Sequence, residues 1–152
     1  MESIIIYEDE GYRKLLPLTY CRPVFDLRCG INTIREKIIR EYNTNKIVLF
    51  CRDYLKDTLL ESDNNLLINQ FTGESALIIN GRILANGLKN KVLPDGEDCI
   101  YTCKGEVAAV RVSGDNLKKV LNSLKNLHLE KCINIKSKCI KIYKRNERIV
   151  IL

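Results

Sequence analysis

Apolar runs and amphipathic segments alternate along the first half of the chain. Ile4 to Tyr7 and Lys46 to Cys51 are almost wholly apolar, as in strands buried on both faces of a parallel sheet. Residues 32–42 instead repeat apolar side chains at helical spacing, and the polar stretch Asn43 to Asn45 ends that predicted helix. A second, short helix is predicted over Arg52 to Glu61. The pattern therefore begins strand, helix, strand, helix.

Strands dominate the second half of the chain, with one further helix. The predicted elements are strands at 66–69 and Ser75 to Asn80, a loop or short helix over 83–90, a β-hairpin of 98–103 with 106–112, a helix over 116–127 and two short strands within 132–152. This order predicts an α/β fold with a three-layer, mostly parallel sheet that ends in a β-hairpin and a helix. The length of 152 residues suits a sizeable core, so we expect residues 1–152 to form a single domain.

The segment between the first strand and the first helix carries three arginines, Arg13, Arg22 and Arg28. In an open α/β sheet this connection lies at the carboxyl edge of the first strand, where ligands usually bind. A guanidinium group holds two oxygens at once, so arginines gathered there suit a phosphate ligand. The alternative is structural: the same arginines would tie a long loop down through backbone carbonyls and Asp26.

Charge and composition narrow the classes of function. Basic residues outnumber acidic ones by 25 to 19, which gives a net charge of +6, and they concentrate after residue 130. Such a segment attracts polyanions, but it lacks the interleaved aromatic side chains that stack on single-stranded nucleic acid. We therefore expect a solvated lysine-rich face and no nucleic-acid partner. The start of the chain lacks a signal-peptide pattern and no apolar run is long enough for a bilayer, which favours a cytoplasmic protein without a membrane partner.

Candidate nucleophiles and metal ligands are sparse. The chain has seven cysteines and one histidine but no C-x-x-C pair, and the nearest approach to zinc-ligand spacing is Cys99 with Cys103 and His128 with Cys132. We expect the cysteines to be mainly small buried apolar residues, and their disulfide state stays open. The acidic stretch Glu8 to Glu10 is a candidate for a metal or for nucleobase and ribose contacts, and equally for a solvated strand end.

Two motifs resemble those of nucleotidyltransferases that act on sugar phosphates. Residues 11–19, GYRKLLPLT, are similar to the family's G-x-G-T-R-L-x-P-L-T loop, and Arg22-Pro23 stands about where the family has a P-K pair. A closer resemblance, over Leu15 to Lys37, is to a divergent branch related to the uridylyltransferase domain of bifunctional N-acetylglucosamine-1-phosphate uridylyltransferase/acyltransferase proteins. Residues 79–84, which contain Asn80-Gly81-Arg82, look like the N-G-R motif of that branch.

The resemblance implies a Rossmann-like nucleotidyltransferase fold and a reaction class. A sugar-1-phosphate attacks the α-phosphate of a nucleoside triphosphate, and pyrophosphate leaves. The default pair of substrates is UTP and N-acetylglucosamine-1-phosphate, and Mg²⁺ is the expected cofactor. Such chemistry depends on positioning and on positive charge around the moving phosphates.

The resemblance also assigns roles to residues of the loop. Arg22 would be the catalytic residue, because it stands where the lysine of the P-K pair contacts phosphates. Arg13 would meet the triphosphate, and Arg28 would add charge or pair with Asp26. Gly30 would permit close approach at the start of the helix. The predicted substrate- and nucleotide-binding residues are Gly11, Arg13, Thr19, Arg22, Asp26, Arg28, Gly30, Asn80, Gly81 and Arg82.

This sequence departs from the family pattern in two places. Residues 8–11, Glu-Asp-Glu-Gly, replace the glycine-rich turn. Arg82 follows Gly81 where the main family has a metal-binding aspartate, so the Mg²⁺ ligands are not identified. The chain also shows no hexapeptide repeats and resembles the nucleotide-binding half alone. These departures leave open a non-catalytic nucleotide- or sugar-phosphate-binding module, with a homo-oligomer or a partner chain that supplies the missing half.

Overall fold

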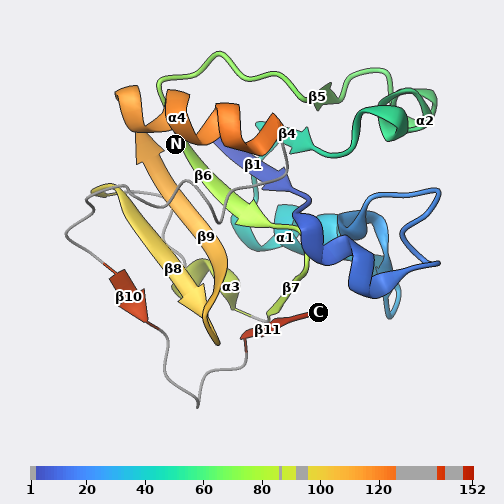
Figure 1. Ribbon diagram of the computed structural model, residues 1–152, viewed down its shortest axis with the longest axis horizontal. Helices are drawn as coiled ribbons and strands as arrows, with labels where there is room; N and C mark the ends of the chain where they lie inside the picture. Colours follow the sequence, from blue (N-terminus) through green and yellow to red (C-terminus); the bar gives the residue numbers. More distant parts are fainter. Residues whose placement is uncertain (1–2, 86, 92–95, 126–139, 143–148) are drawn as a thin grey trace.

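The computed structural model of the chain describes residues 3–85, 87–91, 96–125, 140–142 and 149–152 (Figure 1). In chain order the elements are β1 (Ser3–Tyr7), the 3₁₀ helices η1 (Glu10–Leu15) and η2 (Val24–Asp26), β2 (Arg28–Cys29), β3 (Asn32–Thr33), α1 (Ile34–Tyr42), β4 (Ile47–Phe50), the 3₁₀ helix η3 (Asp53–Leu55), α2 (Lys56–Ser62), β5 (Leu67–Ile68), β6 (Ser75–Asn80), β7 (Ile83–Ala85), α3 (Leu88–Lys91), β8 (Cys99–Cys103), β9 (Glu106–Ser113), α4 (Gly114–Lys125), β10 (Ile140–Ile142) and β11 (Ile149–Ile151).

A seven-stranded sheet with the order β10-β8-β9-β6-β1-β4-β5 forms the centre of the molecule. Strands β6, β1, β4 and β5 are parallel, whereas β9 runs antiparallel to both of its neighbours and β10 lies parallel to β8. The predicted α/β fold with a mostly parallel sheet is thereby confirmed, including the hairpin of β8 and β9. Two smaller sheets pair β2 with β3 and β7 with β11.

Alternate residues of the central strands enter two separate cores, which gives the three layers. Ile4 and Ile6 of β1 belong to the core that includes Ile34 and Ile38 of α1, together with Phe25. Residues 5 and 7 of the same strand belong to the other core, which includes the apolar side chains of α4. Figure 1 shows α4 crossing one face of the sheet, with α1 on the other side. A strand buried on both faces has to be apolar at every position, which explains the run in β1.

Helix α1 begins two residues later than its apolar pattern predicts. Thr33 is the N-cap: its side chain accepts a hydrogen bond from the Glu36 amide, and Glu36 in return bonds the Thr33 amide, which completes a capping box. Asn32 and Thr33 meanwhile form strand β3, which pairs with β2. The helix ends at Asn43, whose φ of 48° is the left-handed conformation common at such ends.

Strand β7 is the main element that the sequence pattern describes wrongly. A loop or short helix was expected over residues 83–90, but Ile83–Ala85 is a strand and only Leu88–Lys91 is helical. Strand β7 pairs antiparallel with β11, which is more than 60 residues away in the sequence. Since that pairing is non-local, no periodicity within 83–90 could reveal it.

Both strands expected near the end of the chain are present, and they have different partners. Strand β10 joins the central sheet beside β8, whereas β11 lies against β7. The residues predicted to lie between them, 144–146, are outside the described part of the chain, as are Asp95, His128, Cys132 and Cys139. No helix among the described residues could cross a membrane, and the longest, α4, has 12 residues.

Candidate functional site

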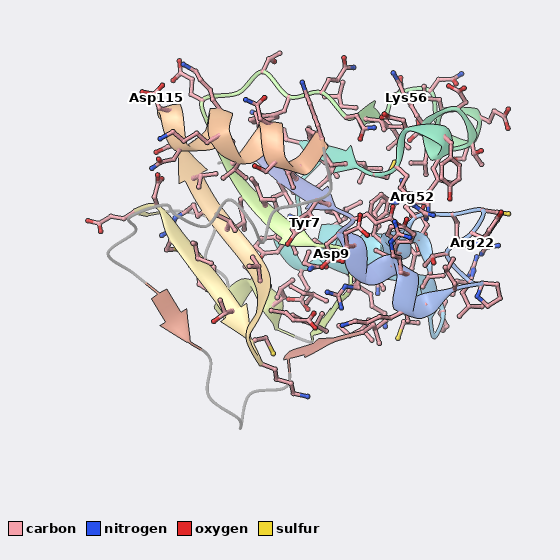
Figure 2. All side chains as sticks on the ribbon, viewed as in Figure 1. Tyr7, Asp9, Arg22, Arg52, Lys56 and Asp115 are labelled. Atoms are coloured by element: carbon pink, nitrogen blue, oxygen red, sulfur yellow. The ribbon has the colours of Figure 1, made fainter. Side chains whose placement is uncertain are left out.

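Three neighbouring parallel strands end side by side and carry charged residues at their carboxyl ends. Tyr7, the last residue of β1, lies opposite Phe50 of β4 and Asn80 of β6. Glu8 and Asp9 therefore follow β1 at the same edge where Arg52 follows β4 and Arg82 follows β6. All four side chains are buried, with exposed fractions of 1% and 5% for the acids and 8% and 2% for the arginines. Figure 2 shows Asp9 and Arg52 at this edge, close to Tyr7.

Arg82 and Asp9 form a two-point ion pair inside the protein. The Arg82 Nε lies 2.7 Å from Asp9 Oδ1 and the Nη2 lies 2.6 Å from Asp9 Oδ2. The same Nη2 donates to Glu106 Oε2 at 2.6 Å, and Nη1 donates to the backbone carbonyl of Leu152. Burial alone would lower the pKa of Arg82, but the hydrogen bonds and negative charge of Asp9 and Glu106 raise that pKa. The N–H groups on the Nε and Nη2 side of the Arg82 guanidinium are therefore all bonded within the chain.

Gly11 and Asn80 complete this buried cluster. Asp9 Oδ1 accepts from the Gly11 amide at 3.1 Å, and Asp9 Oδ2 accepts from Asn80 Nδ2 at 2.8 Å. Asn80 Oδ1 in turn accepts from the Arg82 amide at 2.9 Å. A Cβ on Gly11 would lie 2.3 Å from the Arg82 guanidinium, so only glycine leaves room for it. The structure therefore brings together Gly11, Asn80 and Arg82, three predicted binding residues, as a packed ionic cluster.

Gly81 and Gly30, the two other glycines predicted to bind a ligand, are each required by the local backbone structure, for different reasons. The Gly81 amide donates to the Tyr7 carbonyl at 2.7 Å, and a Cβ there would lie 3.0 Å from both that carbonyl and the Phe25 side chain. Gly30 lies in the turn between β2 and β3 with a φ of +81°, a conformation that favours glycine. Gly30 does not stand at the start of the helix as expected, because Asn32 and Thr33 form a strand before α1 begins.

A second buried ion pair joins Glu8 to Arg52. The Arg52 Nε lies 2.8 Å from Glu8 Oε2, and its Nη2 lies 3.1 Å from Glu8 Oε1. Glu8 Oε1 also accepts from the Val24 amide at 2.9 Å, which fixes the far end of the loop against β1. The pKa of Arg52 is raised, because the bond and charge of Glu8 outweigh the lowering effect of burial. The Glu8 carboxylate is thus neither solvated nor open to a ligand, whereas Glu10 of the same acidic stretch stays partly exposed.

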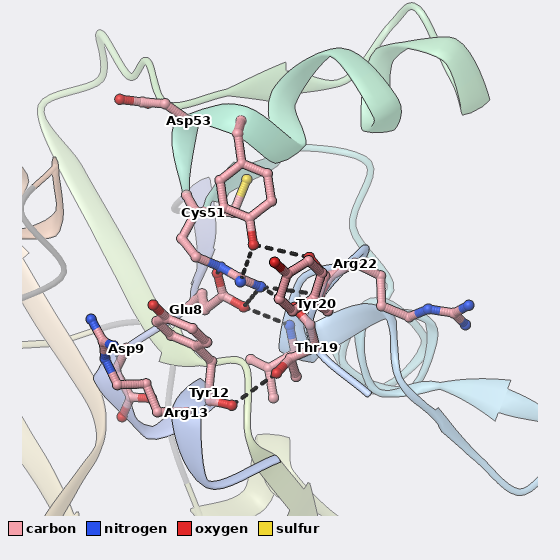
Figure 3. A network of polar contacts seen from close by, with 12 residues as sticks. Glu8, Asp9, Tyr12, Arg13, Thr19, Tyr20, Arg22, Cys51 and Asp53 are labelled. Atoms are coloured by element: carbon pink, nitrogen blue, oxygen red, sulfur yellow. Dashed lines mark hydrogen bonds and ion pairs between the residues drawn. The ribbon is translucent and has the colours of Figure 1, made fainter. Parts of the chain in front are cut away.

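Arg52 also holds the backbone of the loop between β1 and β2. Its Nη2 donates to the carbonyl of Thr19 at 2.5 Å and to that of Arg22 at 3.2 Å (Figure 3). The guanidinium lies over the Tyr12 ring, 4.0 Å from its centroid. Thr19 is buried and donates its hydroxyl to the Tyr12 carbonyl at 2.8 Å. Thr19 therefore braces the loop and does not face a ligand.

The three loop arginines differ in how much of each guanidinium is engaged. Arg13 Nε lies 2.6 Å from Glu10 Oε2, and this pair is exposed. Arg28 Nη1 donates to the carbonyl of Ile31 at 2.8 Å, across the β2–β3 turn. Arg22 is exposed, and its side chain extends away from the polar network (Figure 3). Its guanidinium donates no hydrogen bond to any residue that the structure describes, so Arg22 presents the freest cationic group of the loop.

Asp26 pairs with Arg35 of α1, and the alternative in which Arg28 pairs with it is wrong. Asp26 Oδ1 lies 2.8 Å from Arg35 Nε, in a largely buried ion pair. Burial raises the pKa of Asp26, while the charges of Arg35 and Arg22 act in the opposite direction. Arg28 instead donates to the Ile31 carbonyl within the β2–β3 hairpin. Asp26 therefore anchors the loop to α1.

The described residues do not fit the Mg²⁺ ion that the family resemblance implies. Mg²⁺ takes oxygen ligands at about 2.0–2.1 Å in an octahedral arrangement. Here the carboxylates of Glu8 and Asp9 are taken up by guanidinium groups, and Asp98 accepts from Ser113 and Asn116. Within the described part of the chain, no group of three or more His, Cys, Asp or Glu residues could hold a metal ion. Mg²⁺ stays a prediction whose ligands are unassigned.

Five of the seven cysteines lie in the described residues, and the structure shows no disulfide among them. Cys51, Cys99 and Cys103 are buried, as expected for small apolar residues, whereas Cys21 is exposed and Cys29 is half-buried. Burial raises the pKa of Cys51 to about 12, so this thiol stays protonated at neutral pH. Cys51 is therefore a poor nucleophile, and the described thiols belong to no group of three or more His, Cys, Asp or Glu residues that could hold a metal ion.

Arg52 is the site residue that sequence reasoning missed. Its one signal is its position directly after the buried strand 46–51, at the edge where ligands bind in such sheets. Tyr12 has no comparable signal, because it contacts Arg52 only through the folding of the loop, whereas Tyr54 lies two residues after Arg52 in η3. Spatial pairing of this kind depends on strand order, which the local pattern does not encode.

Replacement of Arg82 by methionine tests the buried ion pair. The variant R82M leaves the Asp9 carboxylate buried without its cation, which costs about 3–5 kcal/mol for pairs of this kind. We expect urea denaturation to show a loss of that size in the free energy of unfolding, or a failure to fold. The control R40M alters an exposed arginine of α1 and should cost less than about 0.5 kcal/mol. A loss below about 1 kcal/mol for R82M would contradict the account.

Glu106 should make stability depend on pH. Its partial burial acts to raise the pKa, but the bonds and charges of Arg82 and Lys14 hold that pKa below its usual range. Its ionised form therefore stabilises the fold above the unfolded-state pKa of about 4.3, and this contribution is lost as the pH falls through the lowered native pKa. We expect E106Q to be less stable than the unaltered protein at pH 7, and the difference to disappear by about pH 3.

Urea denaturation at pH 7 and pH 3 measures that difference directly. The control E61Q changes an exposed glutamate of α2, for which the structure gives no ion pair, and should show little difference at either pH. An effect of E106Q that is equally large at both pH values would show that its carboxylate charge does not stabilise the fold.

The sequence of the chain matches a known protein family. The family model for sugar nucleotidyl transferases matches residues 4–150, a range that includes every strand end described above. A search of curated proteins finds no match. The narrower resemblance to a uridylyltransferase branch stays a prediction. The match covers nearly the whole chain and agrees with its α/β architecture, and the chain therefore belongs to the sugar nucleotidyl transferase family.

Proposed function

We propose that the chain binds the phosphate groups of a nucleotide sugar, or of the nucleoside triphosphate and sugar-1-phosphate that form one, on the outer side of the loop from residue 10 to 30. The observation that carries the proposal is Arg22, an exposed arginine at the carboxyl edge of the sheet whose guanidinium has no hydrogen-bond partner among the described residues. A free guanidinium offers a two-point site for phosphate oxygens.

The surroundings of Arg22 support an anionic ligand. Arg13 and Arg28 are exposed on the same loop, and each keeps N–H groups beyond the one bond that the structure gives it. The buried charges beneath the loop are balanced, since Arg52 faces Glu8 and Arg82 faces Asp9. The positive charge available to a ligand is therefore that of the outer loop.

Family membership supports a reaction class for such a ligand. In the proposed reaction a sugar-1-phosphate attacks the α-phosphate of a nucleoside triphosphate and pyrophosphate leaves, with UTP and N-acetylglucosamine-1-phosphate as the default pair. Arg22 would hold phosphate oxygens and stabilise the charge that develops on them. Such electrostatic stabilisation is the main way in which proteins catalyse phosphoryl transfer. Arg13 and Arg28 would add to the same positive potential.

One observation favours a second candidate, a binding module without catalytic activity. The Asp9 carboxylate is engaged by Arg82, Gly11 and Asn80, so it is not available to a metal at the strand ends of β1 and β6. Such a module would bind the nucleotide sugar and act with a homo-oligomeric or different partner chain. The two candidates share the same phosphate site and differ in whether pyrophosphate is released.

Calorimetric titration with UTP, UDP-N-acetylglucosamine and dTTP tests the proposed site. We expect at least one of them to bind, and R22A to weaken that binding by at least tenfold, because a charge-assisted hydrogen bond contributes about 1.5–3 kcal/mol. The matched control R40A removes an exposed arginine from α1 and should bind like the unaltered protein. Equal affinities of R22A and R40A would remove Arg22 from the site.

A pyrophosphate-release assay separates the two candidates. Release from UTP that depends on N-acetylglucosamine-1-phosphate and falls in R22A would identify the transferase. Binding without release would favour the module.

A further inference from the structure

The loop projects one short segment that the proposed phosphate site does not fully explain. We name residues 20–22, Tyr-Cys-Arg, the tip. Arg52 Nη2 donates to the carbonyl of Thr19 just before the tip and to that of Arg22 at its end, at 2.5 and 3.2 Å. Between these two points the Tyr20 carbonyl accepts from the Tyr54 hydroxyl at 2.9 Å. The backbone of the tip is therefore held from below by two side chains near the end of β4.

The side chains of the tip point outward although the backbone is fixed. Tyr20 is 68% exposed and the neighbouring Tyr54 is 61% exposed. Aromatic side chains gain most from burial, so two exposed tyrosines linked by the hydrogen bond from the Tyr54 hydroxyl to the Tyr20 carbonyl suggest a ligand that covers them. Arg22, at the other end of the tip, contributes an exposed guanidinium without a hydrogen-bond partner among the described residues.

Arg52 contacts Tyr54 and leaves most of that side chain open to solvent. The Arg52 guanidinium sits 5.1 Å from the centroid of the Tyr54 ring and also donates to its hydroxyl. Its other neighbour is Tyr12, whose ring centroid is 4.0 Å away. Arg52 is thus packed against both rings, which fixes the orientation of Tyr54 while most of that side chain stays exposed.

An aromatic face beside a guanidinium matches the two ends of a nucleotide. A nucleobase stacks on an aromatic ring, and the phosphates attached through the sugar accept hydrogen bonds from arginine. We propose that Tyr20 and Tyr54 form a stacking platform for the base of a nucleoside diphosphate whose phosphates bind Arg22, with Arg52 as the positioning residue. The inference rests on the proposed function and names the part of the ligand that the loop recognises. Stacking reads no base edge, so the platform takes nucleoside diphosphates as a class.

Titration of UDP and of inorganic pyrophosphate into matched variants tests the platform. Y20A removes a ring and Y20F keeps it, and Y54A and Y54F form a second pair. We expect Y20A and Y54A each to weaken UDP binding by about five- to 100-fold, the range that base–aromatic stacking gives. Pyrophosphate, which has no base, should bind all four variants within twofold of the unaltered protein. Y20F should keep more UDP affinity than Y20A because it keeps the ring, and Y54F should lose less than Y54A although it lacks the hydroxyl that bonds the Tyr20 carbonyl.

The two ligands distinguish failure of the platform from failure of the phosphate site. If pyrophosphate and UDP bind, but the alanine variants keep full affinity for UDP, the platform is wrong and the phosphate site stands. Equal losses for UDP and pyrophosphate would also overturn the platform, because the tyrosines would then act only by holding the loop. If neither compound binds the unaltered protein, the proposed function fails together with this inference.

Discussion

Asp9 and Arg82 follow two neighbouring parallel strands, and both side chains are buried. Because burying either charge without a partner would be very costly, the two side chains have to form an ion pair. The guanidinium bonds both oxygens of Asp9 at 2.6–2.7 Å and reaches Glu106 from the same edge. Removal of either partner would leave a charge in a region of low dielectric, which is far more costly than the pair itself. The pair also determines two neighbouring residues. Gly11 has to lack a side chain beside the Arg82 guanidinium, and Asn80 bridges Asp9 to the Arg82 backbone.

The ion pair of Glu8 and Arg52 fixes the loop between β1 and β2, as the pair of Asp9 and Arg82 fixes the strand ends. Glu8 bonds the Val24 amide at one end of the loop, while Arg52 bonds the carbonyls of Thr19 and Arg22 nearer its middle. A long connection at a ligand-binding edge would otherwise be costly to order. The inner charges cancel in pairs, and the unmatched positive charge lies outside, on the surface that we propose binds phosphate.

Local pattern in the sequence predicts much of this fold, since apolar runs identify β1, β4 and β6 and helical spacing identifies α1. It fails where distant segments decide the outcome. Strand β7 exists because β11 pairs with it, and Asp26 pairs with Arg35 because α1 packs beside η2. The predicted residues Gly11, Asn80 and Arg82 do lie together, yet the sequence could not show that they form a closed ionic cluster. Arg52 was missed because only the order of strands in the sheet places it beside Glu8.

The central claim is that the protein's own arginines neutralise the carboxylates of Glu8 and Asp9 at the strand ends. We propose on this ground that phosphate binding at the outer loop does not depend on a divalent cation. Titration of UDP-N-acetylglucosamine in Mg²⁺ and then in excess EDTA tests this claim most directly. The account predicts dissociation constants that agree within about twofold, because no metal would lie between the loop arginines and the phosphates. Binding that is lost in EDTA and restored by Mg²⁺ would contradict the account and show that a metal site exists.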